Sequence, residues 1–155
     1  MIEQIVETWT IHNRINLYLL DALTEETLTA TFAPRGRTVY ALFVHIHNVR
    51  LMWFKSSAPE MLEGLEKLEK AEGEVKERLA GALTASGLAV ETLLRDSLTT
   101  REGKIKGFKP HAVAFMGYLI SHESHHRGQV EVALRLSGHA LPDKISYGLW
   151  EWGVR

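Results

Sequence analysis

The chain has 155 residues, of which 45% are hydrophobic and 24% charged, with a formal net charge of −1. This composition is typical of a globular protein, and we expect one domain over residues 1–155. The near-neutral charge excludes a basic surface for nucleic acid, and no apolar run is long enough to predict a membrane span. The absence of cysteine excludes disulfides and thiolate metal ligands. Because the amino terminus also lacks a signal-peptide pattern, we expect a cytoplasmic location.

Apolar residues three or four positions apart predict helices along most of the chain. The first helix is expected over residues 2–22, followed by a short capped turn that begins at Thr24. The segment 33–37 contains proline and glycine and breaks the pattern. Thr38 is then the expected N-cap of a second helix that extends to Ser56.

The second half of the chain predicts two more helices. Residues 57–73 are acidic and lysine-rich and predict a loop with one short exposed helix. A third helix is expected over residues 74–98, with an irregular middle because it contains Gly81 and Gly87. Only residues 104–108 show a strand pattern.

Pro110 is the expected first residue of the fourth helix, and Gly138 is the expected glycine just after its end. The tail, with Trp150 and Trp152, should fold back onto the helices. Four long helices without a sheet predict an all-α fold, an antiparallel four-helix bundle, in which side chains from facing helices build the site.

His122 and His126 are one turn apart in the expected fourth helix, so both imidazoles can reach one metal ion. At about 100° per residue they share one arc with the apolar Phe115, Leu119 and Ala133. Two inward-facing histidines need partners for their ring nitrogens, which favours a bound metal ion. The alternative is two hydrogen-bonded core histidines.

A third ligand should come from the second helix, where His45 and His47 are about 200° apart around the axis. Only one of them is therefore expected to face the core. His45 shares its arc with the apolar Leu42, while His47 falls toward the other side. The predicted metal ligands are His45, His122 and His126, with His47 as the alternative to His45.

The other polar residues near this pattern have assigned or alternative roles. Gln129 lies one turn after His126 and is expected to bind the cofactor by orienting water or substrate, or else to bond another helix. Glu123 is a candidate general base, although a surface acid fits it better. His125 lies beside the ligand arc, either near the metal or in solvent. The remaining histidines are interpreted as structural or surface residues: His12, His111 and His139.

Three histidine ligands leave a coordination position open, as in catalytic rather than structural metal sites. Such a ligand set suits zinc or nickel best, with iron, manganese or copper as alternatives. Residues 122–126 also match the H-E-x-x-H pattern of zinc peptidases. That interpretation is weaker, because position 132 is valine instead of a third histidine and no sheet edge is expected to hold a peptide.

Two segments resemble the DinB/YfiT-like superfamily of metal-dependent enzymes. They are residues 38–46, which end in His45-Ile46, and the pattern His122-x-x-x-His126-x-x-Gln129. The similarity extends over nearly the whole chain through the helix order and the histidine separation. It places the superfamily's metal triad on the same three histidines, and implies an up-down-down-up bundle, a homodimer and a divalent metal.

Characterised relatives include thiol S-transferases that use bacillithiol, mycothiol or glutathione, and a mycothiol-dependent maleylpyruvate isomerase. The resemblance therefore implies a divalent-metal-dependent enzyme that transfers a low-molecular-weight thiol to a small electrophile. Two alternatives stay open: a hydrolase that uses metal-activated water, and a non-catalytic metal-binding, stress-associated protein. The expected partners are a second copy of the chain and a small-molecule substrate, with no nucleic acid and no membrane.

Overall fold

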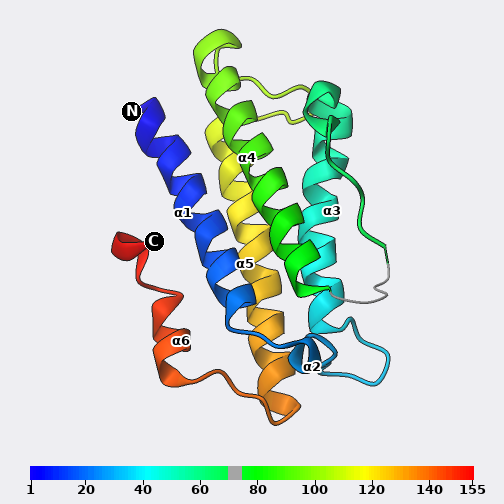
Figure 1. Cartoon of the computed structure of the whole chain (residues 1–155). Helices are drawn as coiled ribbons and strands as arrows, with labels where there is room; N and C mark the ends of the chain where they lie inside the picture. The colour runs from blue at the N-terminus through cyan, green and yellow to red at the C-terminus, as the bar shows by residue number, and fades with distance from the viewer. Residues whose placement is uncertain (70–74) are drawn as a thin grey trace.

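The computed structural model describes residues 1–69 and 75–155, and over these residues the fold is all-helical (Figure 1). The long helices are α1 (Ile2–Asp21), α3 (Val39–Ser57), α4 (Lys76–Thr100) and α5 (Ala112–Leu136). The short ones are α2 (Glu25–Leu28), α6 (Asp143–Gly148), and the 3-10 turns η1 (Pro59–Leu62) and η2 (Trp152–Val154). The strand pattern at 104–108 amounts to one isolated bridge between Ile105 and Phe108. None of the described helices is both long and apolar enough to cross a bilayer.

The helix starts follow side-chain capping. Thr38 caps α3 by accepting a hydrogen bond from the Ala41 amide, and Thr24 forms a capping box at the start of α2, so both predicted starts are confirmed. Pro110 is not the first residue of α5. The helix begins two residues later, because the His111 imidazole accepts a hydrogen bond from the Ala114 amide and thereby caps the helix.

The helix ends also test the sequence predictions. Gly138 follows α5 with a φ of 80°, as expected of the glycine just after a helix end. Helix α4 is continuous through Gly81 and Gly87, so the predicted irregular middle is wrong. The predicted loop at 57–73 contains η1, while its residues 70–73 and the predicted start of the third helix at 74 lie outside the described residues.

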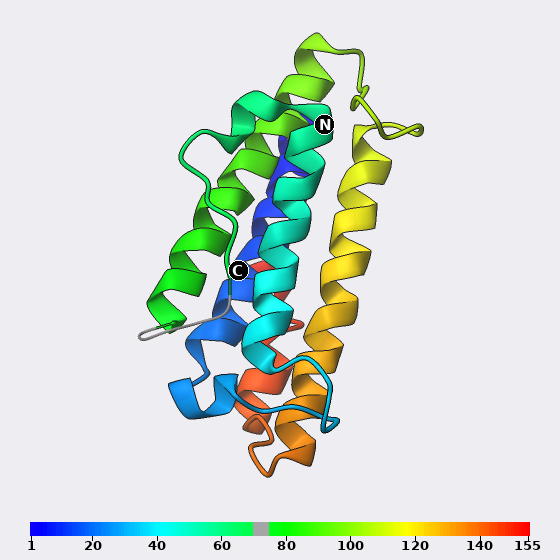
Figure 2. The same cartoon turned by 90° about the vertical axis from the view of Figure 1, so that its right-hand side faces the viewer.

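The four long helices pack side by side (Figures 1 and 2). Helices α1 and α5 begin at one end of the molecule, and α3 and α4 begin at the opposite end (Figure 1). Because α3 and α4 run in the same direction, the chain between them has to return along the length of the helices. Helix α3 packs against both α4 and α5, and Figure 2 shows α3 and α5 next to each other.

The core consists of two apolar clusters, one toward each end of the helices. One contains Leu19, Phe43 and Val130, and the other contains Trp9 and Phe54. Between them lies a buried polar layer, to which α1, α3, α4 and α5 all contribute: His12, Asn13, Asn16, His47, Arg50, Ser86 and Glu123. Buried polar groups are stable only when they are hydrogen-bonded, so this layer restricts how the helices can pack.

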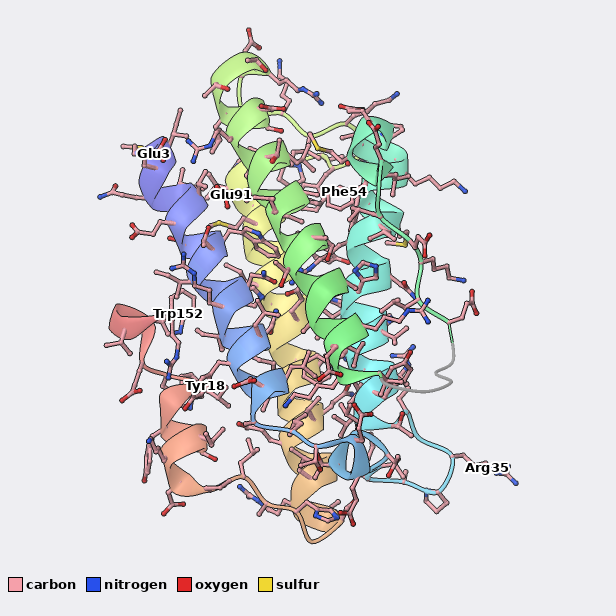
Figure 3. All side chains as sticks on the ribbon, in the orientation of Figure 1. Glu3, Tyr18, Arg35, Phe54, Glu91 and Trp152 are labelled. Carbon is pink, nitrogen blue, oxygen red and sulfur yellow. The ribbon has the colours of Figure 1, made fainter. Side chains whose placement is uncertain are left out.

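The tail packs against α1, as predicted. The guanidinium of Arg155 lies 3.7 Å from the centre of the Tyr18 ring. A Cβ atom on Gly148 would lie 2.3 Å from the Tyr18 hydroxyl, so a larger residue there would have to displace the Tyr18 side chain. Trp152 packs against the adjacent apolar cluster, and Figure 3 shows the tail beside α1.

Candidate metal site

Helices α3 and α5 bring His45, His122 and His126 together. The Nε2 atom of His122 lies 3.3 Å from Nε2 of His45 and 3.1 Å from Nε2 of His126. All three ligand atoms lie within 4.8 Å of one another. Metal–nitrogen bonds of about 2.0–2.1 Å in a tetrahedral site would place neighbouring nitrogens roughly 3.3 Å apart. The three rings therefore have the donor type and spacing that a divalent metal ion needs.

The three side chains lie where α3 and α5 pack against each other. His126 is buried, with 6% of its surface exposed, whereas His45 and His122 are partly exposed. The ring of Tyr118 stacks on His122 with a centroid separation of 6.1 Å, which restrains its orientation. Nδ1 of His122 is buried without a hydrogen-bond partner among the described residues. His45 and His122 therefore form the more exposed part of the triad.

The electrostatics keep the three rings neutral. Burial lowers the pKa of all three imidazoles, and that of His45 falls to about 4. The positive charge of Arg37 and the neighbouring rings contribute to this shift of the His45 pKa, after burial. Neutral imidazole is the form that binds metal, because protonation removes the lone pair. The rings are therefore ready to bind a metal at neutral pH.

Gln129 holds one of the rings in place. Its Oε1 accepts a hydrogen bond of 2.7 Å from Nδ1 of His126, which leaves the lone pair of that ring on Nε2, directed at the other two histidines. The bond is within α5, and among the described residues Gln129 makes no bond to another helix, contrary to the helix-to-helix alternative. Contact between Gln129 and a cofactor stays a prediction.

The sequence predicted that His45 faces the core and that His47 faces away from it, and this prediction is wrong. His47, not His45, points into the core, where it is 1% exposed and bonds Ser86 Oγ at 3.1 Å and the Glu66 carbonyl at 2.8 Å. His45 instead lies beside α5, where its ring centre is 5.2 Å from that of His122 and 4.7 Å from that of His126. Both nitrogens of His47 are engaged, so His45 is the residue of this pair that lies with His122 and His126.

Glu123 is not a surface acid. Its side chain is 0% exposed and its carboxylate accepts hydrogen bonds from Arg50 Nε at 2.7 Å, from Asn16 at 2.7 Å and from His12 at 2.8 Å. Burial alone would raise the pKa of this carboxyl, but the charge of Arg50 and the hydrogen bonds from Arg50 and His12 outweigh burial and hold the pKa well below its usual range. Both oxygens are occupied, so the general-base role in the H-E-x-x-H interpretation does not fit.

The network around Glu123 was missed at the sequence level. Arg50 also donates to Asn13 at 2.8 Å, and Arg127 donates to Asn16 at 2.6 Å. His12, interpreted as a structural or surface residue, is a buried member of this network. His12 lies on the apolar face of the first helix, and this position could have predicted the network. A polar side chain buried on such a face is stable only when it has hydrogen-bond partners.

The remaining histidines lie outside the triad. His125 is exposed, with its ring centre 5.2 Å from that of His126. His111 caps α5, and His139 lies 4.0 Å from Glu26 near the protein surface. His111 and His139 therefore have the structural or surface roles expected of them.

Two cavities contain residues that lie near the triad in the sequence. One of about 520 Å³ is lined by residues of α5 that include His125 and Gln129, together with Phe32. A larger one of about 830 Å³ lies along the first turns of α3 and is lined by residues that include Val44 and Asn48. None of the three histidines lines either cavity, but Gln129, which bonds His126, lines the first.

The chain was compared with known proteins. The model of the DinB family matches residues 1–151, which include all four long helices and the three histidines. No protein with a curated description matches the chain. The family match covers nearly the whole chain. The chain therefore belongs to the DinB family.

Proposed function

We propose that this protein is a divalent-metal-dependent enzyme that transfers a low-molecular-weight thiol to a small electrophile. His45, His122 and His126 would hold the metal, in an up-down-down-up bundle like that of the DinB/YfiT-like superfamily. The observation that carries the proposal is the convergence of three Nε2 atoms at metal-ligand spacing. The family match supports it, since the superfamily includes thiol S-transferases.

The three neutral rings leave coordination positions open, and a divalent metal bound there would supply Lewis acidity that lowers the pKa of a thiol. The protein would contribute the rest. Burial keeps the rings neutral, Gln129 fixes the tautomer of His126, and the partly exposed side formed by His45 and His122 admits the small molecule. The nitrogen ligand set favours zinc or nickel, with iron and manganese as alternatives.

Metal content tests the ligand set. Wild-type protein should purify with, or take up, one divalent ion per chain, and His45→Ala should lose it. His47→Ala is the matched control on the same helix, because His47 bonds Ser86 and Glu66 instead of the triad. It should keep the metal even though it loses stability. Elemental analysis measures the outcome, with circular dichroism to verify folding. Full metal retention in His45→Ala would contradict the site.

Activity tests the reaction class. The metal-loaded protein should conjugate small thiols to an electrophile such as monochlorobimane, and His122→Ala should not. Turnover of esters or amides without thiol would favour a hydrolase. Metal binding without either activity would favour the non-catalytic alternative.

A homodimer and a cytoplasmic location complete the proposal. The first rests on the resemblance and the second on the composition. Size-exclusion chromatography with light scattering measures the mass of the particle, and a monomer at micromolar concentration would contradict the dimer.

A further inference from the structure

An aromatic cluster lies next to the candidate metal site. Its rings come from α3, from the loop before α5 and from α5 itself: Trp53, Phe108, Phe115 and Tyr118. The Trp53 ring is central, because its centre lies 5.5 to 5.7 Å from the centres of the other three rings. The angles between the ring planes are 80° to 86°, which is the edge-to-face arrangement that aromatic pairs prefer. The four rings therefore restrain one another as a packed unit.

Tyr118 connects the aromatic cluster to the triad. Its ring is nearly parallel to the His122 imidazole, with 18° between the planes and 6.1 Å between the centres. The two residues are one turn apart on α5, so the helix itself places them next to each other. Trp53 and Phe108 also lie against the Tyr118 ring, at 5.6 and 6.0 Å between centres. A restrained aromatic ring thus adjoins one of the predicted metal ligands.

This part of the molecule presents apolar surface to the solvent. Tyr118 is 37% exposed. Met52, two turns after His45 on the same face of α3, is 55% exposed. Because α3 and α5 run in opposite directions (Figure 1), the residues after His45 lie beside the residues before His122, as the contact of Trp53 with Tyr118 shows. Exposed apolar surface therefore continues from the partly exposed side of the triad.

Such a surface has a natural role beside a metal site. Single exposed apolar side chains are common, but contiguous aromatic surface next to a few polar groups is typical of places where small molecules bind. A molecule bound at an open coordination position near His122 would extend to the Tyr118 ring within a few bond lengths. A ring that is already held in place loses little conformational entropy when a ligand stacks on it.

We propose that Tyr118 determines the substrate specificity of the triad, by stacking on an aromatic group of the electrophile. The inference rests on the proposed function and names its substrate class, an electrophile whose reactive atom is attached to a planar aromatic ring. Stacking on Tyr118 would direct the reactive atom toward His45 and His122. Trp53 and Phe108 would act through Tyr118, as positioning residues.

The test measures ligand binding to the full chain loaded with Co²⁺, whose visible absorption changes when a ligand occupies an open coordination position. The two probes are acetohydroxamate and benzohydroxamate, which coordinate the ion in the same way and differ in a methyl or a phenyl group. We expect benzohydroxamate to bind about 10-fold more tightly, because only its phenyl ring can stack on Tyr118. Tyr118→Leu, which keeps an apolar side chain but removes the ring, should abolish this preference, and Tyr118→Phe should keep it.

Tyr147→Leu is the matched control, because Tyr147 is an exposed tyrosine on α6 and α6 lies beside α1. It should leave the preference unchanged. Loss of the preference confined to Tyr118→Leu, with Co²⁺ affinity retained, supports the inference.

The contrary outcomes separate the two proposals. Failure of the wild type to bind Co²⁺ would overturn the proposed function and this inference with it. Normal Co²⁺ binding with equal affinity for the two hydroxamates would overturn only the role of Tyr118. The same holds if Tyr118→Leu keeps the preference or if Tyr147→Leu loses it equally. Loss of Co²⁺ binding in Tyr118→Leu would also overturn that role, because the ring would then serve only to position His122.

Discussion

Glu123 and Arg50 form a buried ion pair between the two helices that supply the triad. Glu123 follows His122 directly on α5, and Arg50 lies five residues after His45 on α3. The pair is 0% exposed and satisfied by His12, Asn13 and Asn16, so neither charge is left uncompensated in the core. The same contact that joins α3 to α5 therefore also restrains how the three imidazoles meet.

Replacing Glu123 by glutamine should strongly destabilise the protein. Glu123→Gln leaves the Arg50 charge buried without a counter-charge, and such losses cost about 3–5 kcal/mol. Urea denaturation at pH 7 measures the change in the free energy of unfolding. Glu60→Gln is the control, because Glu60 pairs with Arg101 at the exposed surface and its loss should leave the midpoint nearly unchanged. Equal midpoints for the two variants would contradict the importance of the buried pair.

Gly87 allows helix α4 to approach α1 closely. The Gly87 carbonyl accepts a hydrogen bond of 2.8 Å from Trp9 Nε1, and a Cβ atom on Gly87 would lie 2.2 Å from Asn13 Nδ2. Asn13 in turn accepts from Arg50, so this close approach of α1 and α4 supports the buried polar layer. Gly81, six residues earlier, has no atom within 4 Å of the equivalent position and has no such role.

Alanine at these two glycines should have opposite effects. Gly87→Ala forces Asn13 away from Arg50 and should cost about 1–3 kcal/mol of unfolding free energy, whereas Gly81→Ala removes backbone entropy from the unfolded chain and should gain about 0.5–1 kcal/mol. Thermal denaturation of the two variants side by side measures both effects. A stabilised Gly87→Ala protein would show that α1 and α4 are not held together in this way.

Across the whole molecule, five histidines share a lowered pKa, with burial as the largest cause in each case. They are His12, His45, His47, His122 and His126. They come from α1, α3 and α5 and lie in or beside the polar layer. The folded protein therefore holds these rings neutral, while the unfolded chain protonates them near their ordinary pKa of 6.5.

The metal-free protein should consequently lose stability in mild acid. The unfolded state binds more protons than the folded state once the pH falls below about 6.5, so stability is complete above that pH and is lost as the pH falls through the folded pKa values. Below about pH 4.5 the buried Glu123 carboxylate adds a further loss, because its pKa is also lowered on folding. Urea denaturation at several pH values between 7 and 5 measures the first effect, and a constant midpoint over that range would contradict it.

The sequence allowed the helices and the three candidate ligands to be predicted from local rules, although His45 was chosen on a wrong expectation of which histidine faces the core. Periodicity and capping located α1 and α3 to within a residue, and the four-residue spacing placed His122 and His126 on one face. These features depend on neighbours within one turn, which the sequence contains. The start of α5 was wrong by two residues because a histidine cap has the same local pattern as a surface histidine.

Only the tertiary structure decided the features that depend on where helices lie relative to one another. It showed that His47 is in the core, that His45 lies beside His122 and His126, and that Glu123 is paired with Arg50. The apolar periodicity of a helix predicts which way each side chain points around that helix. It does not predict which residue of another helix the side chain contacts. Burial of polar groups is favourable only when partners from other helices satisfy them, so their roles emerge when the four long helices pack together.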